Sequence, residues 1–202
     1  MRQEKSKLYR WELALLLGVG VALLMGTWTA GQQRALAGQL VRLHVVGASD
    51  SEEDQAVKLR VRDAVLAEAQ PWLEGVCSRE EAEAVLGQHL TELAQAGAEV
   101  SSGAKVTAAI ENDVWFPTKE YTDFSLPAGR YTALRIFIGE GEGRNWWCVV
   151  FPPLCLGSVS EVTQEVGGFS SEQIELITGE SEGYVVKFRL MELWGQLTEI
   201  FR

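Results

Sequence analysis

The stretch Leu13–Ala30, which reads LALLLGVGVALLMGTWTA, contains no charged residue and is almost entirely apolar. As an α-helix it would be about 27 Å long, close to the hydrocarbon thickness of a bilayer. It shows no polar stripe, which a buried helix of a globular domain would be expected to have. Trp11 and Trp28 lie near its two ends, where interfacial tryptophans are common. The stretch therefore predicts either a single-pass anchor or the apolar part of a secretion signal.

The residues before this stretch are net basic, and basic flanks stay in the cytoplasm. The chain after residue 30 is then expected to be exported. A small-residue cleavage pattern at 35–37 is separated from the apolar stretch by Arg34, whereas signal peptides are usually cut closer to it. We therefore favour an uncleaved anchor over a cleaved signal. The expected organisation is a cytoplasmic tail at 1–12, a membrane segment at 13–30, a tether at 31–39 and an extracytoplasmic domain at 40–202.

The formal net charge of the chain is −10, and the first ten residues are net basic whereas the rest of the chain is net acidic. An acidic domain repels nucleic acid and anionic lipid head groups, so we expect no nucleic-acid partner. The chain has 3 cysteines without a C-x-x-C motif and 2 histidines far apart in sequence. This composition signals neither a zinc site nor a redox site, and the sequence predicts no metal and no cofactor.

Hydrophobic periodicity predicts a mixed α+β domain with a small, mainly antiparallel sheet covered by about three helices. Capping boxes at Ser51–Asp54 and Ser78–Glu81 are expected to begin two of these helices. Pro71 and Gly97 are expected to end them. The strands are predicted near residues 40–46, 105–115, 130–138 and 146–151, and the helices near 52–69, 78–96 and 186–201.

The helix predicted at 52–69 has an apolar face at helical spacing. Leu59 is expected on that face, with Val57 and Val65. Lys58 is expected mostly outside it.

The segment Arg144–Cys155 reads RNWWCVVFPPLC and alternates with apolar side chains on both faces. It therefore predicts a strand that is covered on both sides at the centre of the domain. Residues 140–145 before it have the composition of a hairpin loop, so we expect antiparallel pairing with the strand at 130–138.

Cys148 and Cys155 lie in this segment with six residues between them. In an extended strand their Cα atoms would be about 23 Å apart, whereas a disulfide needs about 4.4–6.8 Å. The Pro152-Pro153 pair would have to reverse the chain to allow the bond. A disulfide and two buried free thiols therefore both stay open, and Cys77 is assigned no role.

His44 and Asp50 could form an acid–base pair, but no nucleophile is marked nearby and a structural histidine is the favoured interpretation. The acidic cluster at 50–54 lacks the glycine and the final glutamate of an EF-hand loop, so helix capping explains it better. Gly139–Gly143 contains three glycines but also two glutamates that would repel phosphate. The sequence also contains none of the common hydrolase motifs.

Three blocks of sequence resemble the stage II sporulation protein R family of endospore-forming bacteria: 40–64 (LVRLHVVGASDSEEDQAVKLRVRDA), 129–155 (GRYTALRIFIGEGEGRNWWCVVFPPLC) and 184–193 (YVVKFRLMEL). The second block is the most specific, because its G-x-G-x-N-W-W-C-V run followed by F-P-P-L-C is not a general fold signature. Family members tend to have asparagine where this chain has Ala48. Any capping or binding by that asparagine is lost or moved here.

The resemblance implies a non-enzymatic signalling protein. It would be exported from the forespore into the space between the two sporulation membranes and held at the inner membrane by its N-terminal segment. Its partner would be a membrane-embedded aspartic protease in the mother cell, which then processes pro-sigma-E. The rivals are an extracytoplasmic enzyme such as a cell-wall hydrolase using His44 and Asp50, and a passive tether. Candidate contacts with the protease are Ser49, Asp50, Asp54, Trp115, Tyr121, Glu140, Glu142, Arg144 and Asn145.

Overall fold

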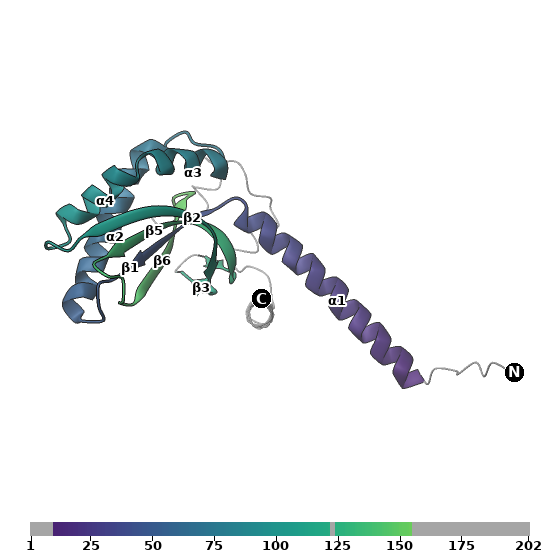
Figure 1. The fold of residues 1–202 in the computed structure, drawn as a ribbon. Coiled ribbons are helices and arrows are strands. Elements are labelled where there is room, and N and C mark those ends of the chain that lie inside the picture. The colour runs from purple at the N-terminus through teal and green to yellow at the C-terminus, as the bar shows by residue number, and fades with distance from the viewer. Residues whose placement is uncertain (1–9, 122–123, 155–202) are drawn as a thin grey trace, which may run out of the picture.

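The computed structural model describes residues 10–121 and 124–154 (Figure 1). One long helix leads into a four-stranded sheet with three helices on one face and a two-stranded hairpin beside it. The elements are α1 (Arg10–Ala37), β1 (Val41–Val46), α2 (Glu52–Leu73), α3 (Arg79–Gln88), α4 (Leu90–Glu99), β2 (Val106–Phe116), β3 (Lys119–Glu120), β4 (Ser125–Leu126), β5 (Gly129–Ile138) and β6 (Asn145–Phe151). The predicted mixed α+β class and the four main strands are confirmed, while the helix predicted at 186–201 lies outside the described residues.

The sheet has the strand order β2-β5-β1-β6. β1 pairs parallel with β5, and the other two pairings are antiparallel, so the sheet is mainly antiparallel as predicted. The predicted pairing of β6 with β5 is wrong, because β1 lies between them. The segment 139–145 is therefore not a hairpin loop, and it crosses the end of β1. Crossing one strand requires a span of about 10 Å, which six or seven residues cover easily.

β6 lies at an edge of the sheet, which corrects the prediction that Arg144–Cys155 forms its centre. The central strands are β1 and β5, which are buried along most of their length. The prediction that β6 is covered on both faces holds for its second half. Cys148 and Val150 belong to the core beneath the helices, and Val149 belongs to the core on the opposite face.

The first core lies between the sheet and helices α2, α3 and α4. Val57, Val61 and Val65 of α2 pack here against inward-facing strand residues such as Leu43 and Ile136. These side chains recur at helical spacing on α2 and at every second position on the strands, which is why one face of each element is apolar. This core therefore holds α2 and β1 in a fixed relation.

Two predictions about α2 are wrong. Leu59 is 37% exposed, whereas Lys58 is buried with 5% exposure, because the core stripe passes through 57, 61 and 65 and Lys58 lies beside it. Pro71 does not end α2, which continues to Leu73. A proline so close to the end of a helix removes one backbone donor but interrupts little of the helix.

The helix predicted at 78–96 is two helices that meet at His89, whose ring stacks on Trp72 at 4.2 Å. Gly97 is not a stop signal, because it lies inside α4, and a Cβ there would come within 3.0 Å of Val106 Cγ1. The predicted caps are confirmed. The amide of Asp54 donates to Ser51 Oγ at 3.1 Å, and that of Glu81 donates to Ser78 Oγ at 3.2 Å.

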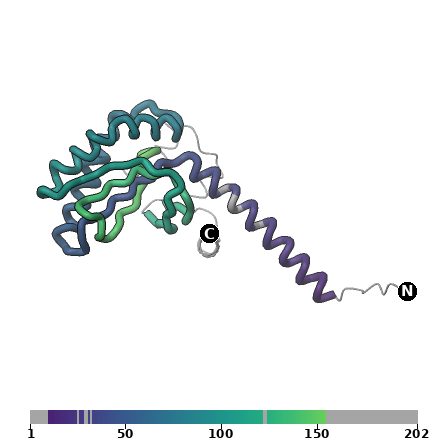
Figure 2. The backbone as a smooth tube through the Cα atoms, in the orientation of Figure 1, coloured from purple at the N-terminus to yellow at the C-terminus, as the bar shows by residue number. Residues whose placement is uncertain are grey.

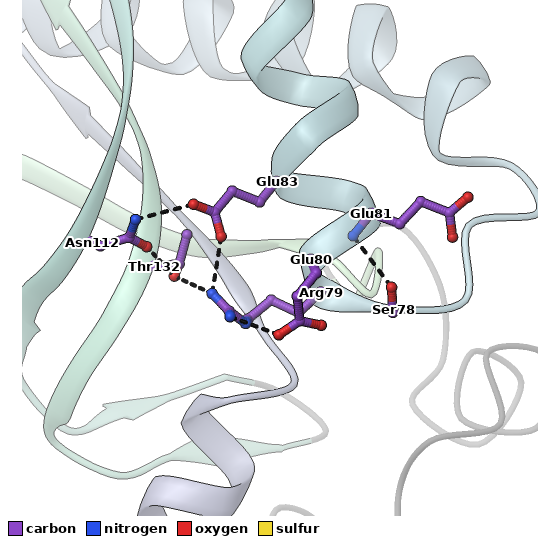
Figure 3. A network of polar contacts seen from close by, with 7 residues as sticks. All are labelled: Ser78, Arg79, Glu80, Glu81, Glu83, Asn112 and Thr132. Carbon is purple, nitrogen blue, oxygen red and sulfur yellow. Dashed lines mark hydrogen bonds and ion pairs between the residues drawn. The ribbon is translucent and has the colours of Figure 1, made fainter.

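A polar network ties α3 to the helix-covered face of the sheet (Figure 3). Arg79 Nη1 lies 3.0 Å from Glu83 Oε2 and donates to Thr132 Oγ1 at 2.6 Å. Thr132 donates in turn to Asn112 Oδ1 at 2.6 Å, and Asn112 Nδ2 donates to Glu83 Oε1 at 3.0 Å. Each of these four residues makes contact with two of the others, so the network has a structural role.

The second core lies on the face of the sheet opposite the three helices. We call this side of the sheet the second face. Its core consists of Leu36, Leu40, Phe116, Phe124, Leu126, Tyr131, Ala133, Val149 and Leu154. The β3–β4 hairpin contributes Leu126 to it. Helix α1 runs through most of the segment predicted as a tether, and its last turn buries Leu36 here.

Away from this contact, α1 extends from the domain, and Figure 2 follows its backbone into β1. It is long and apolar enough to cross a membrane, judged by length and composition, although a signal sequence meets the same criterion. Its large apolar side chains, Leu24 and Trp28 among them, are exposed. The helix therefore fits an anchor or a secretion signal.

Candidate partner-binding corner

Two of the predicted contact surfaces meet at the C-terminal end of β1. The segment 47–54 follows β1 directly, and the segment 139–145 crosses the same end on its way from β5 to β6. We call residues 47–54 and 139–145 the corner. Sequence reasoning proposed both segments, but only the insertion of β1 between β5 and β6 brings them into contact.

The backbones of the two segments are joined directly. The amide of Gly143 donates to the carbonyl of Gly47 at 2.8 Å, and the amide of Arg144 donates to Asp50 Oδ1 at 2.8 Å. A Cβ at position 143 would lie 2.3 Å from the carbonyl oxygen of Ser49. Only glycine therefore fits at 143, and the close approach of the two segments depends on it.

Lys58 of α2 connects this helix to both segments of the corner through hydrogen bonds. Its Nζ donates to the carbonyl oxygen of Arg144 at 3.0 Å and to Gln55 Oε1 at 2.5 Å. Gln55 Nε2 donates to the carbonyl oxygen of Ser49 at 2.8 Å. Burial lowers the pKa of Lys58, and the nearby Arg144 charge lowers it further. The ammonium group therefore holds the backbone of the corner in place. Its hydrogen bonds offset part of the free-energy cost of burying the charge.

Several predicted contact residues of the corner have structural partners. Ser49 Oγ donates to Asp54 Oδ2 at 2.5 Å, so these two side chains face each other at the start of α2. Asp50 Oδ1 also lies 3.6 Å from Arg144 Nε, and both of these side chains are about two-thirds exposed, at 67% and 68%. Glu140, Glu142 and Asn145 are exposed as well. The corner therefore presents an acidic surface on a braced backbone.

The structure does not bring Trp115 and Tyr121 to the corner. Trp115 pairs with Arg130 at the end of the sheet opposite Ile138, which directly precedes the corner segment 139–145. Tyr121 packs on the second face, where its hydroxyl donates to the carbonyl of Trp147 at 3.0 Å. These two residues therefore belong to a different region from the corner.

A row of polar side chains on the second face runs across all four strands to the corner. Arg135 Nη1 lies 2.7 Å from Glu111 Oε2, and Arg135 Nε donates to His44 Nδ1 at 3.2 Å. His44 Nε2 lies 3.0 Å from Asn145 Oδ1. Since Nδ1 accepts, the hydrogen sits on Nε2 and is donated to Asn145. The row links the corner to β2, β5 and β1.

His44 is a structural histidine in this arrangement. It is 5% exposed and stacks on Trp147 with ring centroids 3.9 Å apart. Burial lowers its pKa to about 4, and the Arg135 and Arg42 charges contribute, while the bond to Asn145 opposes the shift. Both ring nitrogens have partners other than Asp50, so the structure does not form the His44–Asp50 pair.

Lys58, Gly143, Arg135 and Arg42 are missed by reasoning from the sequence. Arg135 and Arg42 do carry a signal, because a charged residue inside an apolar strand pattern must find a partner if it is buried. In residues 10–121 and 124–154, no three or more of the metal-ligating side chains His, Cys, Asp and Glu gather into a group.

Cys148 is buried on β6 and is disulfide-bonded, whereas Cys77 is an exposed free thiol. Cys155 lies outside the described residues. The pairing of Cys148 with Cys155 therefore stays a prediction.

Comparison with known proteins identifies relatives. Over 120 residues the chain is 42% identical to the stage II sporulation protein R of Bacillus subtilis (strain 168), an alignment that covers 58% of this chain and 54% of that protein. The chain thus aligns with about half the length of this curated relative. No solved structure matches the chain significantly. The family model for stage II sporulation protein R matches residues 37–161, which is more than half of the sequence and contains both segments of the corner. The chain therefore belongs to the stage II sporulation protein R family.

Proposed function

We propose that the chain is an exported sporulation signalling protein that activates a membrane-embedded aspartic protease, which then processes pro-sigma-E in the mother cell. Membership of the stage II sporulation protein R family supports the sporulation role. The observation that carries the contact site is the corner itself. Two exposed segments from distant parts of the chain lie there on one fixed backbone.

The proposed location follows from α1. Its apolar side chains are exposed, and its length fits a bilayer. In the proposal, α1 holds the protein at the forespore membrane or directs its secretion, and residues from 40 onward act in the space between the two membranes. The corner then faces a protease in the opposite membrane.

The proposed mechanism is a shift of the protease towards its active state. Such a shift requires that the domain bind the active state more tightly than the inactive one, because equal affinity changes nothing. The backbone of the corner is already ordered by Lys58, Asp50 and Gly143, so little conformational entropy remains to be lost on binding. Its acidic side chains favour a basic surface on the protease.

A role as an enzyme using His44 and Asp50 finds no support in the geometry, since the ring nitrogens of His44 are bonded to Arg135 and Asn145. Replacing His44 by Gln separates the two roles. An enzyme would lose its activity completely even when the folded protein accumulates normally. Under the activator proposal, the His44→Gln variant should still signal, and signalling should fall only in proportion to the fraction of the protein that is unfolded.

The corner is tested with the double substitution Glu140→Lys and Glu142→Lys. Liposomes that carry the full chain are mixed with liposomes that carry the protease, and cleavage of pro-sigma-E in the protease liposomes is followed over time. Charge reversal should weaken binding to a basic surface, and we expect the cleavage rate at limiting activator to fall about tenfold, which corresponds to about 1.4 kcal/mol.

The matched control is Glu68→Lys, which reverses an exposed charge on α2 away from the corner. It should leave cleavage unchanged. Equal activity of the corner variant and this control would contradict the contact site. Absence of any stimulation by the unaltered chain would contradict the activator role itself.

A further inference from the structure

The least explained charge in the described structure is Arg42 of β1. Its side chain is completely buried on the second face, with 0% exposure. The guanidinium carbon lies 4.2 Å from the ring centroid of Phe116 and 5.0 Å from that of Tyr131. Nη2 donates to the hydroxyl of Tyr121 at 3.0 Å. Aromatic rings thus surround the charge, and they offset only part of the cost of removing it from water.

Most of the hydrogen-bonding capacity of Arg42 is unused. Nε and Nη1 have no hydrogen-bond partner among the described residues, and none of the ion pairs found there includes Arg42. The neighbouring phenols do not provide a negative charge, because burial raises the pKa of Tyr131 to about 12 and also raises that of Tyr121. Buried arginines are normally paired with an anion, since an unpaired buried charge is strongly destabilising.

The position of the second face identifies where such an anion comes from. The described chain ends at Leu154, which is 3% exposed and belongs to the core on this face. Residues 155–202 follow directly and contain eight acidic residues against three basic ones. The acidic residues are Glu161, Glu165, Glu172, Glu175, Glu180, Glu182, Glu192 and Glu199. An anion from another protein would leave the buried charge unpaired whenever that protein is absent.

We propose that residues 155–202 dock on the second face and that one of their glutamates forms a buried ion pair with Arg42. The hydrogens on Nε and Nη1 point to different sides of the guanidinium, and a carboxylate oxygen that accepts from either of them would pair the buried charge. Glu161 and Glu165 are closest to Leu154 in sequence and are the first candidates. The docked segment would complete the core on the face that the three helices leave uncovered.

Thermal unfolding of the full chain in detergent tests the ion pair. Arg42→Met keeps most of the volume and removes the charge, so it leaves the partner carboxylate buried and unpaired. We expect the Tm to fall by about 10 °C. Each of the eight glutamates is also replaced singly by Gln, and one of these variants should show a fall of similar size. Combining that substitution with Arg42→Met should cost much less than the sum of the two, because the whole pair is then gone.

Arg62→Met is the matched control. Arg62 also lies over an aromatic ring, at 4.5 Å from Trp146, but its carboxylate partner Asp63 is 65% exposed. Its Tm should change by no more than about 2 °C, since exposed ion pairs contribute little.

Three outcomes would overturn the proposal. An unchanged or raised Tm for Arg42→Met means that the charge has no anion to lose. A lowered Tm for Arg42→Met without any sensitive glutamate variant means that the segment does not supply the anion, and a Tm that then rises with protein concentration assigns the anion to a second copy of the chain. If Arg42→Met fails to fold, the glutamate series decides alone: one sensitive position supports the pair, and eight insensitive positions reject it.

Discussion

At the scale of single residues, the corner depends on a few positions at which no other residue type fits. Gly143 is the clearest example, because the carbonyl oxygen of Ser49 occupies the place where a Cβ would lie. Neither hydrophobic pattern nor motif spacing reveals this requirement. A glycine in a loop could equally serve a turn, and Gly139 and Gly141 in the same segment have positive φ angles of 59° and 69°.

We predict that Gly143→Ala destabilises the protein by about 1–3 kcal/mol, because the two backbones must separate to admit the methyl group. Urea unfolding of the full chain measures the change. Gly87→Ala is the control: this glycine lies inside α3, and a Cβ added there would meet no atom within 4 Å. It should raise stability by about 0.5–1 kcal/mol. Equal effects of the two substitutions would show that the close approach at 143 is not tight.

At the scale of elements, α2 acts on the corner through Lys58. This residue lies beside the core stripe of the helix, and its long side chain carries the ammonium to the carbonyl of Arg144. The helix that packs on the sheet therefore also holds the segment that enters β6. Whether Lys58 reaches the corner depends on the rotation of α2 about its axis. The periodicity of α2 predicts which residues face the sheet only to within one position.

We predict that Lys58→Met lowers the free energy of unfolding by about 1–2 kcal/mol, since the stem is retained and the charged hydrogen bonds are lost. Amide hydrogen exchange should accelerate in residues 139–145. Arg60→Met, which changes an exposed neighbour on α2, should leave this exchange as it is. Unaltered exchange in the Lys58 variant would mean that α2 does not support the corner.

At the scale of the whole molecule, the row from Glu111 to Asn145 connects every strand of the sheet and makes stability depend on pH through His44. The folded ring has a pKa of about 4, against 6.5 for a free histidine. Between these values the unfolded chain binds a proton that the folded chain does not bind. The contribution of His44 is therefore complete above pH 6.5 and is lost as the pH falls towards 4.

We predict that the stability difference between the wild-type protein and His44→Gln shrinks by about 3 kcal/mol between pH 7.5 and pH 4. Both proteins contain the same carboxylates, so the contribution of carboxylate titration drops out of the difference between their unfolding free energies. Unfolding free energies at the two pH values provide the measurement, and an NMR titration of the His44 ring provides a second one. A difference that is independent of pH would mean that the folded ring is not held neutral.

Much of the architecture follows from local patterns along the chain. The apolar stretch at 13–30, the four strands, the caps at Ser51 and Ser78 and the family all follow from residue order, because hydrophobic periodicity and capping act over a few residues. Both segments of the corner are also marked in the sequence, one as the capped start of a helix and the other as a loop between two strands.

Tertiary structure alone decided which segments meet. The insertion of β1 between β5 and β6 moved β6 to the edge and turned an expected hairpin into a crossing over β1. The same insertion placed His44 between Arg135 and Asn145, and it buried Arg42 beneath Phe116 and Tyr131. Strand order depends on contacts between residues distant in sequence, which a local pattern does not encode, and for that reason the corner and the buried charge appear only in the folded molecule.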